Sequence, residues 1–228
     1  MPSPSLRIVF DLDDTLYPER SFALSGFRAA GTWADAEFGV TGMAAEMTRL
    51  FEEGQLGPLF KQALTSHVPE HGPEHLEGLV EIYRTHAPEI MLFDDGQWAL
   101  EHYARHGPLG LITDGTTDMQ AGKVRALDIE HLFAEIILTD ALGGRQFRKP
   151  HPLSYERIEA AIGGDDVQLV YVGDNPAKDF IIPNAKGWIT IQVKRAERGI
   201  HDPDAIAEGG APQHLISSLR DLPNILDM

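Results

Sequence analysis

The stretch LRIVFDLDDT, residues 6–15, combines a short, mostly apolar run with three acidic side chains that follow it directly. Four more apolar runs of this kind occur along the chain, at residues 109–113, 135–139, 167–172 and 188–193. Continuous apolar runs are typical of parallel strands that are buried on both faces. The segments between the later runs can each form a helix, at residues 116–127, 152–162 and 177–186. This alternation predicts an α/β fold with a doubly wound parallel sheet and right-handed crossovers.

One long segment after the first expected strand interrupts the alternation. Residues 18–89 contain no convincing strand, and their apolar residues recur at three- and four-residue spacing. Glycine and proline divide the segment into four expected helices, at residues 21–38, 42–53, 58–67 and 74–85. We therefore expect a small α-helical cap at residues 18–89, inserted after strand one into a core formed by residues 1–17 and 90–228. Ligands of open α/β sheets bind beyond the carboxyl ends of the strands, where such a cap would also lie.

Composition narrows the class of partner. The chain has 228 residues, of which 43% are hydrophobic, and its 19 basic and 35 acidic residues give a net charge of −16. So acidic a surface repels nucleic acid and anionic lipid, and we expect neither as a partner. The absence of cysteine excludes disulfides and thiol nucleophiles. Without an export signal or a long apolar run, we expect a cytoplasmic protein, either a monomer or a homodimer.

Carboxylates follow two of the expected strands. Asp11 and Asp13 are two residues apart on an extended segment, so both side chains project to the same side. Their repulsion requires a bound hard metal ion, a retained proton, or both. Asp174 follows the strand at 167–172 and can reach the same metal as Asp11 if the two strands are neighbours. Each cluster alone also fits a turn and helix cap, but their joint occurrence favours carboxylate-bound Mg²⁺.

Two other segments provide groups that bind phosphate. Thr113, Asp114 and Gly115 end the strand at 109–113 and lead into a helix, whose backbone N–H groups can bind an anion. Lys149 precedes paired prolines and a helix, and can present one cation to the same site. Alone, the first segment is also an ordinary helix cap, and the second also fits a solvated surface lysine.

Taken together, the strings FDLDDTLYPE, LITDG, RKPHP and VGDNPAKD resemble the four ordered motifs of the haloacid dehalogenase-like hydrolase superfamily. The chain looks like a member of the phosphatase branch, and the resemblance extends from residue 6 to about residue 193. It implies a Rossmann-like core with the first strand central and an α-helical cap in the first insertion point. It also implies a Mg²⁺-dependent phosphatase that hydrolyses a small-molecule phosphomonoester through an aspartyl-phosphate intermediate.

The resemblance assigns roles to individual residues. Asp11 resembles the nucleophile, and Asp13 resembles the general acid and base. Thr113 and Lys149 resemble phosphate ligands. Asp174 resembles a Mg²⁺ ligand, beside Asp11 and the backbone carbonyl of Asp13. Three more positions complete the expected site: Asp114 and Gly115 in the phosphate-binding turn, and Asp179, which supports the site and orients Lys149 or a metal-bound water. Position 114 is Asp where many relatives have Asn, and the role of this extra anion stays open.

Three alternative activities remain compatible with these motifs. A phosphomutase uses the same aspartyl-phosphate and differs in how long that intermediate persists in water. A 2-haloacid dehalogenase of the same fold needs no acid for its leaving halide, so Asp13 argues against it. A non-enzymatic phospho-accepting signalling domain leaves the helical insertion and the GDNPAKD string unexplained.

Early in the insertion, Tyr17, Arg20 and Arg28 can approach the site, although each is more typical of a surface or hinge residue.

Overall fold

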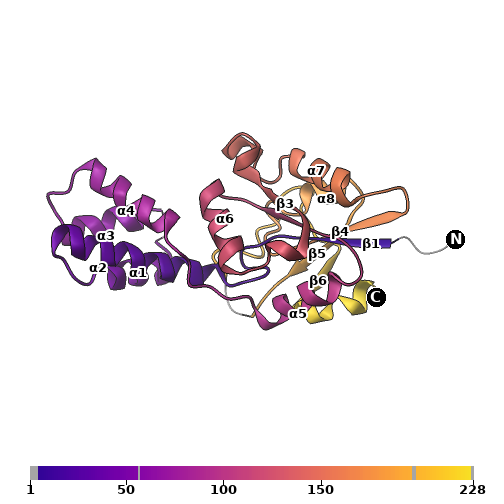
Figure 1. Cartoon of the computed structure of the whole chain (residues 1–228), viewed down its shortest axis with the longest axis horizontal. Coiled ribbons are helices and arrows are strands. Elements are labelled where there is room, and N and C mark those ends of the chain that lie inside the picture. The colour runs from indigo at the N-terminus through magenta and orange to yellow at the C-terminus, as the bar shows by residue number, and fades with distance from the viewer. Residues whose placement is uncertain (1–4, 56, 197–198, 227–228) are drawn as a thin grey trace. The chain divides into compact units, whose positions relative to one another are not determined.

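The computed structural model describes residues 5–55, 57–196 and 199–226, and it divides into two compact units (Figure 1). One unit comprises Met1–Glu19 and Met91–Met228, and the other comprises Arg20–Ile90. The first unit contains a six-stranded sheet in the order β3-β2-β1-β4-β5-β6, in which every pair is parallel. The strands are β1 (Ser5–Phe10), β2 (Leu109–Thr113), β3 (Phe133–Leu138), β4 (Val167–Gly173), β5 (Ile189–Val193) and β6 (His214–Ile216). The expected doubly wound α/β sheet, with the first strand inside it, is confirmed.

Helices cover both faces of this sheet. Figure 1 shows α7 and α8 on one side, and α5 with the C-terminal helix on the other. The α-helices of this unit are α5 (Asp94–Tyr103), α6 (Thr117–Ala126), α7 (Leu153–Ile162), α8 (Ile181–Ala185) and α9 (Pro223–Leu226). The expectation of a helix over 177–186 is wrong at its start. The backbone carbonyl of Asn175 accepts the N–H groups of Lys178 and Asp179, at 3.2 and 3.0 Å, so a turn precedes α8.

The register between β1 and β4 positions the site. Their pairing runs without a break from Ser5 opposite Val167 to Phe10 opposite Val172. The N–H of Asp11 then donates to the carbonyl of Val172 at 2.9 Å, which extends the ladder one step beyond β1. Because β2 pairs with β1 on its other side, the chain reverses its winding direction at β1, and such a switch point forms a crevice at the carboxyl ends of the strands.

The large apolar side chains of the sheet explain why these segments are strands. Every residue of β2 is buried, as are Leu169 to Gly173 in β4. Val9, Ile112 and Tyr171 form one cluster with α7 and the turn before α8. Burial of each large apolar side chain contributes roughly 1.5–3 kcal/mol, so the strands are held where their carboxyl ends meet.

The second unit is helical. It contains α1 (Glu19–Phe38, which begins in the first unit), α2 (Met43–Glu52), α3 (Leu59–His67) and α4 (Pro73–Thr85), close to the four ranges expected from the apolar spacing. Phe27, Met47 and Leu64 lie in its own hydrophobic core, and other aromatic side chains pack against that core: Trp33, Phe38, Phe51 and Phe60. Among the described helices, none has the length and apolar character needed to cross a membrane.

The chain leaves and re-enters the first unit at neighbouring points. The N–H of Phe93 donates to the carbonyl of Leu16 at 2.9 Å, so the two connections to the inserted residues are joined within the first unit.

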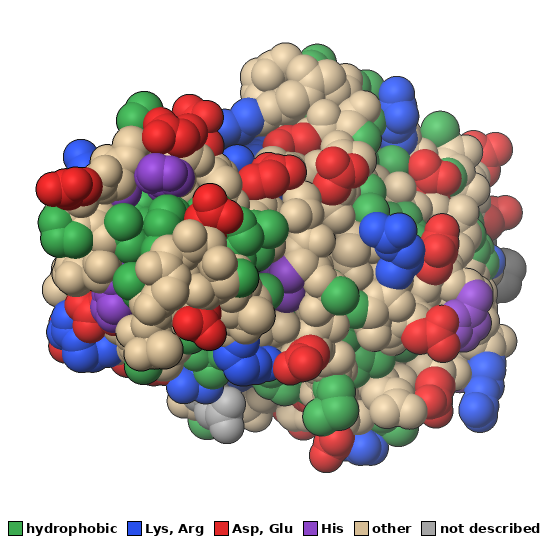
Figure 2. Space-filling view, turned by 60° about the vertical axis from the view of Figure 1, so that its left-hand side comes forward, with side chains coloured by type: hydrophobic (Ala, Val, Ile, Leu, Met, Phe, Trp, Pro, Cys, Tyr) green, Lys and Arg blue, Asp and Glu red, His purple; other side chains and the backbone are tan. Residues whose placement is uncertain are grey.

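On the face shown in Figure 2, acidic side chains are scattered and interspersed with basic ones.

Candidate active site

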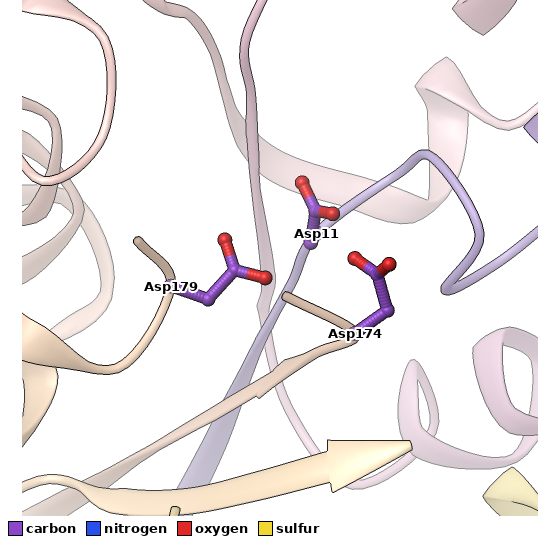
Figure 3. Close-up of side chains that lie close together, drawn as sticks. All are labelled: Asp11, Asp174 and Asp179. Atoms are coloured by element: carbon purple, nitrogen blue, oxygen red, sulfur yellow. The ribbon is translucent and has the colours of Figure 1, made fainter. Parts of the chain in front are cut away.

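Three carboxylates converge at the carboxyl ends of β1 and β4. Asp11 follows β1, Asp174 follows β4, and Asp179 comes from the turn before α8 (Figure 3). One oxygen from each lies within 4.8 Å of the others. Asp11 and Asp179 are 3% and 0% exposed, so water screens their mutual repulsion poorly. Such a cluster requires nearby positive charge.

Lys149 provides part of that positive charge. Its Nζ lies 2.5 Å from Asp11 Oδ1 and 2.8 Å from Asp179 Oδ1, and it donates to the hydroxyl of Tyr171 at 3.2 Å. The side chain of Lys149 is completely buried. Burial alone would lower the pKa of Lys149, but Asp11 and Asp179 raise it well above its ordinary value. Lys149 is therefore a fixed cation between two of the three carboxylates.

One cation leaves the cluster with excess negative charge. Burial, opposed by Lys149 and reinforced by Asp179, raises the pKa of Asp11 to about 7. Burial also raises the pKa of Asp174 well above its ordinary value, and repulsion from Asp179 and Asp11 raises it further. Both carboxyl groups therefore favour a proton or a second cation at this position.

A glycine permits the close approach of Asp179. A Cβ added at Gly173 would lie 3.0 Å from Cγ of Asp179 and 3.2 Å from the ring of Tyr171. Asp179 Oδ2 also accepts the N–H of Asn175 at 3.0 Å. The glycine that ends β4 therefore leaves room for a buried carboxylate, and that carboxylate in turn fixes the loop that carries Asp174.

Asp13 has a different environment from Asp11. Lys123 Nζ lies 2.6 Å from its Oδ1, Gln120 Nε2 donates to its Oδ2 at 2.9 Å, and the Tyr17 hydroxyl donates to Oδ1. Burial alone would raise the pKa of Asp13, but these donors, Lys123 foremost, lower it below its ordinary value. Asp11 and Asp13 thus have separate lysine partners, Lys149 for Asp11 and Lys123 for Asp13.

Thr113 is linked to Asp13 through Gln120, whose side-chain amide also donates to the Thr113 hydroxyl. Neither Gln120 nor Lys123 was among the residues expected from the sequence. Both lie on α6, three residues apart, and are buried. One signal was available in the sequence. Gln120 and Lys123 lie on one face of the helix that comes after Thr113, and long polar side chains on a buried face usually have a polar partner.

Asp114 carries the extra anion whose role the sequence left open. Its Oδ1 accepts the backbone N–H of Lys149 at 3.0 Å and the Thr139 hydroxyl at 2.9 Å, and its Oδ2 lies 3.0 Å from Lys178 Nζ. Burial would raise the pKa of Asp114, but Lys149 and Lys178 lower it. Both oxygens therefore bind protein groups. Lys178 is the cation that balances this charge, a pairing that could not be predicted from residue types alone.

The remaining candidates have simpler positions. Gly115 has φ 147 and leads from Asp114 toward α6, a conformation that favours glycine. Tyr17 is fully buried against Asp13, so the expectation of a surface residue is wrong for it. Arg20 pairs with Glu52, and Arg28 Nη2 lies 2.6 Å from Oε2 of Glu89, in exposed pairs of the second unit.

Comparison with known proteins gives consistent matches. A family model described as haloacid dehalogenase-like hydrolase matches residues 8–193. Glyceraldehyde 3-phosphate phosphatase of Methanopyrus kandleri is 27% identical over 240 residues, which cover 96% of each chain. Phosphoserine phosphatase of Thermus thermophilus is 26% identical over 169 residues, which cover 73% of this chain and 64% of that protein. The HAD-hydrolase YfnB of Bacillus subtilis, solved with magnesium bound, has a similar fold, with a TM-score of 0.69 and 18% identity over 99% of this chain and 100% of that one.

Proposed function

We propose that this chain, which belongs to the haloacid dehalogenase-like hydrolases, is a Mg²⁺-dependent phosphatase that hydrolyses a small-molecule phosphomonoester. The observation that carries the proposal is the placement of Asp11, which lies at the end of a central strand against a fixed cation, Lys149, and beside Asp174. Beside this carboxylate, Lys149 can bind the oxygens of a phosphoryl group, and Asp174 can bind a metal ion together with Asp11. Relatives named for glyceraldehyde 3-phosphate and phosphoserine support a small phosphate ester as substrate.

The carboxylate cluster fits Mg²⁺. Magnesium prefers oxygen ligands and usually takes one or two carboxylates, and here buried carboxylates outnumber the lysine that lies between them. Asp11 and Asp174 would hold the ion, with the backbone carbonyl of Asp13 as a further ligand and Asp179 beside them. When bound, the ion supplies positive charge that keeps these carboxyl groups ionised and offsets the charge of the phosphate.

Phosphate ester hydrolysis then proceeds in two steps, in which Asp11 and Asp13 have different roles. In the first step, Asp13, which its donors keep ionised before substrate binds, takes the acidic proton of the phosphate monoester. An oxygen of Asp11 then forms a bond to phosphorus while the bond from phosphorus to the ester oxygen breaks, and Asp13 gives this proton to the leaving alcohol. In the second step, Asp13 as carboxylate takes a proton from water, whose oxygen attacks phosphorus. The bond to Asp11 breaks, which restores its carboxylate and releases inorganic phosphate. Thr113 and Lys149 stabilise the phosphoryl oxygens throughout.

Two substitutions test this division of roles. We expect Asp11→Asn to abolish both turnover and the covalent intermediate, because the amide removes the nucleophile. We expect Asp13→Asn to lose roughly 10²–10⁴-fold with an alkyl phosphate and much less with an aryl phosphate, whose leaving group needs little protonation. In Asp13→Asn, phosphorylated Asp11 should accumulate and appear as a mass increase on its peptide.

The assay is release of inorganic phosphate from phosphorylated sugars, nucleotides and organic acids, with Mg²⁺ and with chelator. Asp165→Asn, on the exposed loop before β4, is the matched control and should leave turnover unchanged. Activity that survives complete chelation, or substantial activity of Asp11→Asn, would contradict the proposal. A phosphoenzyme that persists in water and transfers its phosphate to a second sugar would instead indicate a phosphomutase. A cytoplasmic location and a monomeric or homodimeric state stay predictions.

A further inference from the structure

Lys123 is a buried cation whose position the proposed chemistry does not yet explain. Its side chain is 1% exposed, and its Nζ lies 2.6 Å from Asp13 Oδ1 and 4.0 Å from Glu19 Oε1. Removing an ammonium group from water costs several kcal/mol unless a partner compensates it. Asp13 compensates part of this cost, so the charge of Lys123, on the buried face of α6, lies against the side chain expected to transfer protons.

Gln120 lies one turn earlier on the same face of α6 and is completely buried. Its Nε2 donates both to Asp13 Oδ2, at 2.9 Å, and to Thr113 Oγ1. Its Oε1 is buried without a hydrogen-bond partner in the part of the chain that the structure describes. The opposite amide orientation would place this oxygen against the Asp13 carboxylate, so the electrostatics fix the orientation observed. Because Thr113 Oγ1 accepts from Gln120, its own hydrogen stays available to an anion.

Tyr17 completes the arrangement from the other side of the first motif. Its ring is fully buried and its hydroxyl donates to Asp13 Oδ1. The two oxygens of Asp13 therefore accept from three side chains that belong to two separate segments, the turn after β1 and helix α6. A carboxylate held at both oxygens cannot rotate about its terminal bond without breaking at least one of these contacts.

We infer that Lys123, Gln120 and Tyr17 are positioning residues that hold the Asp13 carboxylate in place for proton transfer, and that Gln120 also aligns Thr113. The inference rests on the proposed function and adds residues to its site. None of the three side chains needs to touch the substrate, because each acts through Asp13 or Thr113. Their effect on the reaction therefore depends on how much the reaction depends on Asp13.

This dependence gives the variants a signature. Proton donation matters most for an alkyl phosphate, whose alkoxide is a poor leaving group, and least for an aryl phosphate. We expect Lys123→Met to lower kcat for an alkyl phosphate by about 10–100-fold, which is part of the typical contribution of a general acid. With an aryl phosphate the loss should be less than about 3-fold. Gln120→Leu and Tyr17→Phe should show the same selectivity at smaller magnitude.

A double-mutant cycle tests whether the effect passes through Asp13. In an Asp13→Asn background, Lys123→Met should cause no further loss with the alkyl phosphate, since residues that act as a unit are non-additive. Arg125→Met is the matched control, because Arg125 is exposed on the same helix and its Nε donates to the backbone of Ala121. This variant should match the wild type with both esters.

Equal losses with the two esters, or a full additional loss in the Asp13→Asn background, would overturn the inference. Circular dichroism identifies any variant that fails to fold, and Tyr17→Phe, which removes a single oxygen atom, keeps the test available in that case. The inference fails separately from the proposed function: wild-type enzyme would then still release phosphate and Asp11→Asn would still be inactive, while the ester selectivity would be absent.

Discussion

Replacing Lys149 with methionine should destabilise the protein strongly when no metal is present. The substitution keeps the length of the side chain but removes the cation 2.5 Å from Asp11 and 2.8 Å from Asp179. At an effective dielectric constant of about 20, each of these pairs contributes roughly 6 kcal/mol of Coulomb energy before desolvation. Removing one partner of a buried pair typically costs about 3–5 kcal/mol. For a chain of this size, that corresponds to a fall in Tm of about 6–20 °C.

The pH dependence of the loss follows from the carboxylates that remain. The pKa of Asp11 is already raised to about 7, by burial and by Asp179 against the opposing effect of Lys149, and loss of Lys149 raises it further. A carboxyl group with a raised pKa binds more protons in the folded state than in the unfolded state, so its contribution to stability falls as pH rises. We therefore expect a larger loss at pH 8 than at pH 5.5.

Urea and thermal unfolding in chelator, followed by circular dichroism, measure both quantities. Lys186→Met is the matched control, because Lys186 forms an ion pair of 2.6 Å with Glu159 at the surface, and such a pair contributes at most about 1 kcal/mol. Asp179→Asn, combined with Lys149→Met, should recover part of the loss by removing one uncompensated anion. A loss below about 1 kcal/mol, or equal losses at the two pH values, would refute the assignment of Lys149 as the charge that balances the cluster.

Three further perturbations address other charges. Mg²⁺ at about one hundred times its Kd should stabilise the wild type by roughly 2.7 kcal/mol, and Asp174→Asn should remove most of this gain in a thermal shift assay. Asp114→Asn should lower the free energy of unfolding by about 1–3 kcal/mol, because Lys178 loses its partner at 3.0 Å. Urea unfolding should show that the double variant with Lys178→Met recovers part of this loss. An unchanged free energy of unfolding in Asp114→Asn would contradict the pairing. Asp95→Asn should cost about 2 kcal/mol, because Asp95 Oδ2 accepts from Arg195, Ser218 and the backbone of Leu219. Burial alone would raise the pKa of Asp95, but these donors lower it. The difference in free energy of unfolding between Asp95→Asn and the wild type should therefore be present at neutral pH and shrink below about pH 4.

The sheet and the carboxylate cluster were largely predictable from the sequence, for a physical reason. Buried parallel strands need continuous apolar runs, so the strands around Asp11 and Asp174 could be recognised from residue type alone. Acidic residues directly after two such runs then imply proximity, provided that the strands are neighbours. The pairing of β1 with β4 satisfies that condition.

The groups that surround Asp13 were harder to predict, because a helical pattern shows which residues share a face but not which element that face contacts. Lys123 and Gln120 can be read as one face of α6, but the sequence does not show that the face contacts the turn after β1. The pairing of Asp114 with Lys178 depends in the same way on where the turn before α8 lies. Helix α5 was not predicted, although the two acidic residues in its first turn, Asp94 and Asp95, are typical of a helix start.

The hydrogen bond between the backbones of Leu16 and Phe93 has a consequence for how this protein can change over evolution and in the laboratory. It joins the two ends of the insertion at 2.9 Å, so the intervening residues form a loop whose ends are already closed by the core. Insertions whose ends lie close together are the ones that domains tolerate best. Residues 20–90 can therefore be exchanged for another helical module, or for a short turn, without changing the register of β1 against β4. The sequence of the insertion and the strand register that positions Asp11 and Asp174 can therefore vary independently of each other.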